Sequence, residues 1–78
     1  MLILFHKEDC PFSAKVRQFM SDHHISFVAV SCSKEAPSRK ILKTLGGKEQ
    51  VPFLLDTDKG KWMYESGDII DYVKENYL

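Results

Sequence analysis

The sequence has only two cysteines and no long apolar run, and both shortages limit what the chain can be. Cys10 and Cys32 cannot build a disulfide framework, and they lie too far apart in sequence for the short spacing of metal-binding pairs. No run approaches the roughly 18 apolar residues of a membrane-spanning helix, and no signal peptide is recognisable. We therefore expect a protein of the cytoplasm with reduced thiols.

The chain also lacks an excess of charge of either sign, with 11 Lys and Arg residues against 11 Asp and Glu among its 78 residues. This balance argues against a general nucleic-acid or membrane surface, because such partners attract a marked basic excess. Local charged groups can still hold a small anion. The hydrophobic share of 44% is ordinary for a globular protein, so residues 1–78 are expected to form one small domain and a monomer.

What the chain does have is a cysteine at a junction between a strand and a helix. An apolar run predicts a short buried strand over 1–6, and the helical spacing of the apolar residues that follow predicts a helix over 11–23. Pro11 suits the first turn of that helix, where its missing N–H costs nothing and its φ is already set. Cys10 is therefore predicted to be the N-cap residue.

A cysteine at a helix N-cap is well placed to react as a thiolate. Its sulfur is expected over the free N–H groups of Phe12 and Ser13, at the positive end of the helix dipole. Lys7 adds a full positive charge, whereas the two acidic residues after it act against the shift. Together these groups should lower the pKa of Cys10 from about 8.5 toward the range of about 3.5–7.5 seen at helix termini. The alternative is a small packed cysteine, the common fate of a free thiol.

The rest of the chain predicts three more strands and two more helices. The strands are expected over 25–30, 51–56 and 61–65, and the helices over 37–46 and from Ser66, as a candidate N-cap, to the C-terminal end. Ile41, Leu42 and Leu45 supply the apolar face of the middle helix. The first strand, helix and second strand predict a parallel pair with a right-handed crossover. The order β-α-β-α-β-β-α therefore predicts an α/β chain with a four-stranded mixed sheet and three helices.

Three stretches resemble the glutaredoxin family. The segment 7–13, Lys-Glu-Asp-Cys-Pro-Phe-Ser, resembles a glutaredoxin active site. The segments 50–54 and 64–70 resemble the glutathione-binding half of glutaredoxins and of glutathione transferase N-terminal domains. The resemblance spans nearly the whole chain in the expected order, and it implies the minimal thioredoxin fold.

The resemblance also implies a chemistry. Ser13 occupies the place where dithiol glutaredoxins carry a second cysteine, and a hydroxyl cannot form a disulfide. It can donate a hydrogen bond to the Cys10 sulfur and favour the thiolate. The chain is thus expected to be a glutathione-dependent thiol-disulfide oxidoreductase that acts by a monothiol mechanism. Its substrates would be glutathionylated proteins or small mixed disulfides, with glutathione as co-substrate and no metal.

The glutathione site that the resemblance implies draws on three segments. Val51–Pro52 resembles the cis-proline that faces the active-site cysteine, and its backbone would pair with the cysteinyl part of glutathione. Ser66 and Gly67 open a helix whose N–H groups can bind a carboxylate, and Asp68 can pair with an α-ammonium. Equally, these residues can simply cap the helix. The full implied set is Lys7, Phe12, Gln50, Val51, Pro52, Glu65, Ser66, Gly67 and Asp68.

Other interpretations stay open. One is a glutathione transferase, although the chain is expected to lack a helical domain for an electrophile because it ends at Leu78. Another is a [2Fe–2S] module held by two Cys10 thiolates and two glutathiones, although that branch usually has Gly where Pro11 stands. A third is a scaffold that binds glutathione without turnover. Cys32 is expected to be a structural or surface thiol and His6 a solvated side chain.

Overall fold

The computed structural model describes residues 1–78 as four strands and three helices. In chain order these are β1 (Leu2–His6), α1 (Pro11–Asp22), β2 (Val28–Ser31), α2 (Ser38–Gly46), β3 (Phe53–Asp56), β4 (Lys61–Tyr64) and α3 (Ser66–Tyr77). The strands form one mixed sheet in the order β2-β1-β3-β4. β1 runs parallel to β2 and antiparallel to β3, and β3 pairs antiparallel with β4. This is the minimal thioredoxin fold that the sequence predicted.

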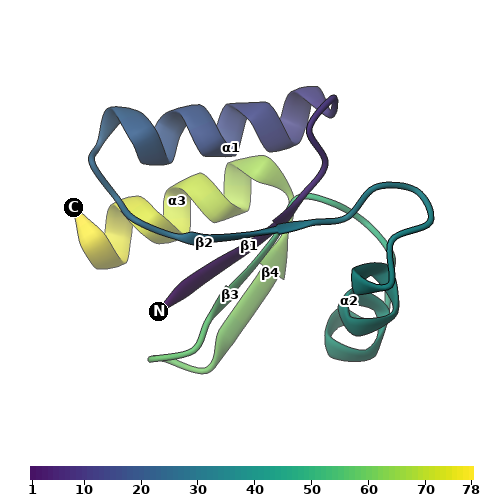
Figure 1. Cartoon of the computed structure of the whole chain (residues 1–78). Coiled ribbons are helices and arrows are strands. Elements are labelled where there is room, and N and C mark those ends of the chain that lie inside the picture. The colour runs from purple at the N-terminus through teal and green to yellow at the C-terminus, as the bar shows by residue number, and fades with distance from the viewer.

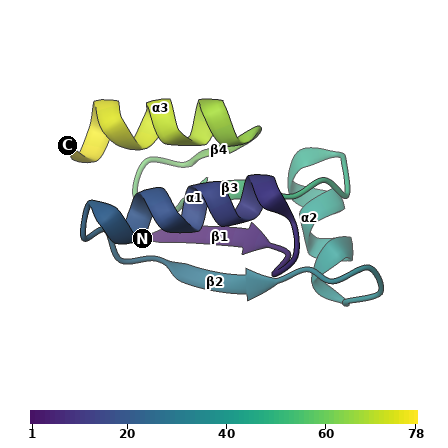
Figure 2. The same ribbon diagram turned by 90° about the horizontal axis from the view of Figure 1, so that it is seen from above.

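The helices cover the two faces of the sheet unequally. α1 and α3 lie side by side on one face, whereas α2 lies on the other face near one end of the sheet (Figure 1). Viewed from above, α2 lies beyond the carboxyl end of β1, at the opposite end of the sheet from the N-terminus (Figure 2). None of the three helices has both the length and the apolarity that a membrane span requires.

Alternating side chains of the central strands build a core on each face of the sheet. Under α1 and α3 the buried residues are Leu2, Leu4, Val16, Met20, Leu54, Ile69 and Val73. Under α2 they are Phe5, Cys32, Leu42, Phe53 and Tyr64. Because β1 and β3 contribute to both cores, they form a rigid centre, and the carboxyl end of β1 delivers the chain directly to Cys10.

Local chemistry explains the start of α1 and the end of α2. Cys10 is the N-cap of α1, with extended backbone at φ −85° and ψ 120°, and Pro11 follows at the first helical position, as predicted. Gly47 ends α2 with φ 88°, a conformation that favours glycine. At Gly46 the Tyr64 hydroxyl packs so close to the backbone that a Cβ would collide with it. That hydroxyl donates to the Lys48 carbonyl oxygen at 2.9 Å, which fixes the segment after α2.

Several predicted boundaries were wrong. β2 begins at Val28 rather than at residue 25, because the Ile25 N–H donates to the Met20 carbonyl oxygen and closes the end of α1 instead of pairing in the sheet. β3 begins at Phe53 rather than at residue 51, which leaves Val51–Pro52 before the strand. α1 ends at Asp22 and β4 at Tyr64, each one residue earlier than expected.

α2 differs most from its prediction. Leu42 is its only fully buried apolar side chain, whereas Ile41 and Leu45 are exposed. α2 lies over only one end of the sheet, so a single side chain reaches the core beneath it (Figure 1). Pro37 is the N-cap of this helix rather than its first residue.

Candidate functional site

Cys10 lies half-buried at the junction between β1 and α1. Burial is the largest single influence on its pKa and raises it. Against burial act the N–H and hydroxyl of Ser13, the N–H of Phe12 and the charge of Lys7. These lowering effects prevail, so the pKa of Cys10 lies below that of an ordinary thiol, in the predicted direction. The sulfur makes no capping hydrogen bond, so the N–H groups and the helix dipole act on the thiolate at longer range.

Ser13 is completely buried one helical turn after Cys10. Its Oγ accepts a hydrogen bond from the Lys7 N–H at 3.3 Å. A hydroxyl also has one hydrogen to donate. Hydrogen bonding by this hydroxyl lowers the pKa of Cys10, because it favours the negatively charged sulfur.

A cavity of about 250 Å³ adjoins this junction and is formed by residues far apart in the sequence. Its lining residues are Phe12, Gln50, Val51, Pro52, Glu65 and Ser66. All six belong to the glutathione site that the sequence predicted. The Val51–Pro52 peptide bond is cis, as the family resemblance implied. Gln50 Nε2 donates to Glu65 Oε1 at 2.9 Å and so connects two of the three segments that line the cavity.

The N-terminus of α3 forms one side of this cavity, but Ser66 is not its cap. Glu65 holds that position, and Ser66 is the first helical residue and is buried. Glu65 has φ 68°, which is uncommon for a residue with a side chain and costs on the order of 1–3 kcal/mol. Backbone conformations of this kind concentrate at functional sites. The strained junction turns Glu65 toward Gln50 and presents the first turn of α3 to the cavity.

Three of the predicted binding residues lie outside the cavity lining. Lys7 pairs with Asp9, with 3.5 Å between Nζ and Oδ1. Gly67 and Asp68 are exposed in the first turn of α3. These three residues could contact only a ligand that extends beyond the cavity, because none of them lines the cavity itself.

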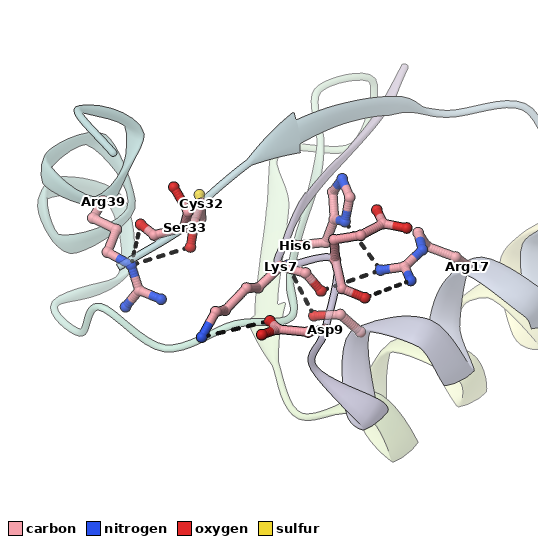
Figure 3. Close-up of polar contacts among 9 residues, drawn as sticks. His6, Lys7, Asp9, Arg17, Cys32, Ser33 and Arg39 are labelled. Atoms are coloured by element: carbon pink, nitrogen blue, oxygen red, sulfur yellow. Dashed lines mark hydrogen bonds and ion pairs between the residues drawn. The ribbon is translucent and has the colours of Figure 1, made fainter. Parts of the chain in front are cut away.

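Sequence reasoning missed a polar cluster behind the Cys10 junction. His6 is buried rather than solvated, and Arg17 contacts its Nδ1 at 3.1 Å (Figure 3). Burial, followed by the charge of Arg17, lowers the pKa of His6. Arg17 lies off the apolar stripe of α1, a position that ordinarily faces water. A usable signal was its position four residues after Ser13, since side chains on a helix lean toward its N-terminus.

The second cysteine differs from the first in its burial. Cys32 is fully buried under α2, and its thiol donates to Ser38 Oγ at 3.2 Å. Of the two placements that we expected, structural or surface, the structure shows the structural one. No three His, Cys, Asp or Glu side chains gather as a metal site.

Comparison with known proteins identifies the family. The family model that describes the glutathione S-transferase N-terminal domain matches residues 4–78. The chain belongs to this family. The family that matches is thus the transferase N-terminal domain rather than specifically a monothiol glutaredoxin. A comparison with curated proteins gave no match.

Solved structures agree with the transferase N-terminal domain assignment. A diazinon-metabolizing glutathione S-transferase from the silkworm Bombyx mori superimposes with a TM-score of 0.85 at 24% identity, covering 99% of this chain and 38% of that one. Glutaredoxin 2 from Salmonella typhimurium, solved with glutathione, gives 0.81 at 25%, covering 94% and 32%. A trimeric glutathione transferase from Leishmania gives 0.79 at 26%, covering 96% and 17%. The chain therefore spans less than two fifths of the length of each.

Proposed function

We propose that this transferase N-terminal domain is a glutathione-dependent thiol-disulfide oxidoreductase with a monothiol mechanism. The observation that carries the proposal is Cys10 itself, a half-buried N-cap thiol with a lowered pKa next to a cavity. The second supporting feature is Ser13, which provides a hydroxyl at the position where a second thiol would complete an internal disulfide.

The reaction needs only one protein thiol. The Cys10 thiolate attacks the glutathione sulfur of a mixed disulfide, forms a bond to it and releases the substrate as a thiolate, which takes up a proton. The thiolate of a second glutathione then attacks the glutathione sulfur bound to Cys10. Oxidised glutathione leaves and the Cys10 thiolate is restored. Glutathione is the reductant, and Cys32 has no part in either step because it is fully buried.

The cavity supports glutathione as the co-substrate. We assign the cysteinyl part of the ligand to the Val51 backbone and the α-carboxylate of its γ-glutamyl end to the N–H groups of Ser66 and Gly67. Asp68 would pair with the α-ammonium. At the other end, Lys7 and Gln50 would hold the glycine carboxylate. Phe12 and Glu65 complete the walls of the cavity. The similar structure of glutaredoxin 2, solved with glutathione, supports glutathione as the ligand.

Family membership favours glutathione conjugation as a second candidate. In that reaction the glutathione thiolate itself is the nucleophile, so the protein sulfur is dispensable. The oxidoreductase would act on glutathionylated proteins or small disulfides. It would act as a monomer, whereas one transferase among the similar structures is described as trimeric.

A pair of single substitutions separates these candidates. Cys10→Ser should abolish glutathione-dependent reduction of a small mixed disulfide, and Cys32→Ser, the matched thiol-to-hydroxyl control, should keep most of it. The rate is followed by the oxidised glutathione produced, and a conjugation assay with an electrophilic aromatic substrate runs in parallel. Equal loss in both variants would exclude the monothiol mechanism. Conjugation that survives in Cys10→Ser, without disulfide reduction in the parent, would establish the transferase instead.

A further inference from the structure

Arg17 ties the segment before Cys10 to the helix that follows it. Its Nη1 donates to the Lys7 carbonyl oxygen at 3.3 Å, and its Nη2 donates to the Glu8 carbonyl oxygen at 3.2 Å. Nη1 also lies 3.1 Å from His6 Nδ1 (Figure 3). A planar guanidinium with several fixed donors suits three acceptors on consecutive residues. The segment 6–8 and the first two turns of α1 are therefore held as one unit.

The same segment holds the backbone of Cys10 and the side chain of Ser13. The Lys7 N–H donates to Ser13 Oγ, and the Cys10 N–H donates to the Lys7 carbonyl oxygen at 3.2 Å. Lys7 thus contacts Arg17, Ser13 and Cys10 through its two backbone polar groups. Ser13 Oγ forms no other hydrogen bond within the protein. With one lone pair used by Lys7, its hydroxyl hydrogen has no acceptor in this structure and can turn to a Cys10 sulfur that carries negative charge.

The His6 ring completes the arrangement from β1. It is buried, and the charged groups that act on its pKa are Arg17 from α1, which lowers it, and Glu8 from the following loop, which raises it. Burial and Arg17 keep the ring neutral, so Nδ1 can accept from the guanidinium. Protonation would place two cations against each other. The neutral ring therefore fixes the direction of the Arg17 side chain.

We propose that Arg17 is a positioning residue for the thiol chemistry of Cys10: it fixes Lys7 so that the Lys7 N–H stays on Ser13 Oγ and the Ser13 hydroxyl hydrogen is directed to the sulfur. Arg17 touches no reacting atom and acts through two intermediates. The inference rests on the proposed role of Cys10 as the nucleophile, but the arrangement that it describes belongs to the free protein and needs no bound glutathione.

The test measures the thiolate of Cys10 without glutathione. In a Cys32→Ser background, the rate of alkylation by iodoacetamide is followed against pH, and mass spectrometry confirms Cys10 as the modified residue. Arg17→Met should raise the pKa of Cys10 and lower its thiolate fraction about threefold to tenfold at pH values below that pKa, since one pKa unit is tenfold. Arg17→Lys keeps the positive charge but loses the planar set of guanidinium donors, so its pKa of Cys10 should resemble that of Arg17→Met.

Ser13→Ala supplies the decisive comparison. If Arg17 acts through the Ser13 hydroxyl, Arg17→Met should change the pKa of Cys10 much less in a Ser13→Ala protein than in the parent. An equal change in the two backgrounds would mean that Arg17 acts directly through its charge, and the proposal would be overturned. A parent-like pKa in Arg17→Lys would overturn it as well.

Arg39 is the matched control for the loss of an arginine that binds carbonyl oxygens. Its Nε donates to the carbonyl oxygens of Cys32 and Ser33 at 3.1 and 2.9 Å (Figure 3). Its Nη1 donates to the Glu49 carbonyl oxygen at 2.9 Å. Arg39→Met should leave the pKa of Cys10 unchanged, and a shift equal to that of Arg17→Met would show only general loosening. Should Arg17→Met not fold, Arg17→Lys alone carries the comparison. Because alkylation requires no turnover, an inactive enzyme with the expected pKa pattern would reject the proposed reaction and keep this inference.

Discussion

At the scale of single residues, the proposed function makes Ser13 the residue that decides which redox chemistry Cys10 can perform. Both side chains belong to the start of α1, three positions apart, where neighbouring Cβ atoms lie about 5–6 Å from each other. A thiol at position 13 would need only a modest adjustment to reach a disulfide with Cys10. The hydroxyl prevents that bond and, through its hydrogen, favours the thiolate.

Ser13→Cys should therefore convert the protein to a dithiol. Oxidation should give an internal disulfide between positions 10 and 13, seen in the mass spectrum as the loss of two hydrogens, and reduction of protein disulfides should improve. A spectrum of the oxidised variant that shows only glutathione attached to Cys10 would contradict this expectation.

Asp68 provides a second residue-scale prediction, because it is exposed and outside the cavity lining. If it pairs with the α-ammonium of glutathione, the charge-assisted bond is worth roughly 1.5–3 kcal/mol. Asp68→Ala should then weaken glutathione binding about tenfold or more, since about 1.4 kcal/mol is a factor of ten. Calorimetric titration in a Cys10→Ser background measures affinity apart from reactivity. Asp71→Ala, an exposed carboxylate one turn further along α3, is the control. Equal affinities would mean that Asp68 only stabilises its own helix.

The residues that sequence alone identified share one property. The roles of Cys10, Ser13 and Pro52 depend on their immediate neighbours along the chain, so a helix start and a motif suffice to find them. His6 and Arg17 depend on a contact across eleven residues between a strand and a helix. Neither residue stands out in the local sequence pattern. Only the fold reveals that Arg17 contacts the buried His6 ring.

At the scale of elements, a buried carboxylate connects β3 to α3. Asp56 is fully buried, and its Oδ2 accepts from the hydroxyls of Tyr72 and Tyr77. Burial raises the pKa of Asp56, but the two hydroxyls and the N–H groups of Asp58 and Lys59 prevail and lower it. The hydrogen bond to Asp56, with burial, raises the pKa of Tyr77 to about 12. The end of α3 is thus fastened to the sheet by ionised Asp56 and protonated tyrosines.

This cluster should make stability depend on pH at both extremes. Because the folded pKa of Asp56 is lowered, its contribution is present above the unfolded value of about 3.9 and is lost as pH falls through the folded pKa. Because the folded pKa of Tyr77 is raised, its contribution is present below about 10 and is lost as pH rises toward about 12.

Asp56→Asn tests the cluster by urea unfolding across this pH range. At neutral pH the variant should lose about 2 kcal/mol or more, the order of a hydrogen bond to a charged group. The difference from the parent should shrink below about pH 4, where the parent also loses the charge. Asp58→Asn is the control, since its exposed pair with the N-terminus should contribute only about 0–1 kcal/mol. A constant difference between Asp56→Asn and the parent at every pH would contradict this account.

Element order was predictable here, and element edges were less so. The strand and helix patterns are strong enough to give the sheet and its three helices. The residues 25–27 alternate like a strand, but the Ile25 N–H donates to the Met20 carbonyl oxygen at the end of α1 and so does not pair in the sheet. The position of α2 over one end of the sheet, which exposes Ile41 and Leu45, follows from packing that no local pattern records.

At the scale of the whole molecule, the face that α2 leaves open carries an apolar row. Val28, Ile3, Leu55 and Trp62 stand opposite one another in register across the four strands, so their side chains share one face. Ile3 and Leu55 are half-buried, whereas Val28 and Trp62 are 46% and 47% exposed. A stable protein interface uses roughly 20–30 residues a side. Four side chains can therefore support only weak association.

Weak association should appear where charge repulsion is smallest. The formal net charge is zero at pH 7, so we expect reversible self-association at high concentration near that pH and a monomer near pH 9, where repulsion returns. Trp62→Lys should keep the chain monomeric at both pH values, because it interrupts the row and places a charge on an edge strand. Leu78→Lys adds the same charge at an exposed site outside the row. Sedimentation velocity distinguishes the causes: if net charge alone governs association, the two lysine variants behave alike, whereas a role for the row requires that Leu78→Lys still associates more than Trp62→Lys.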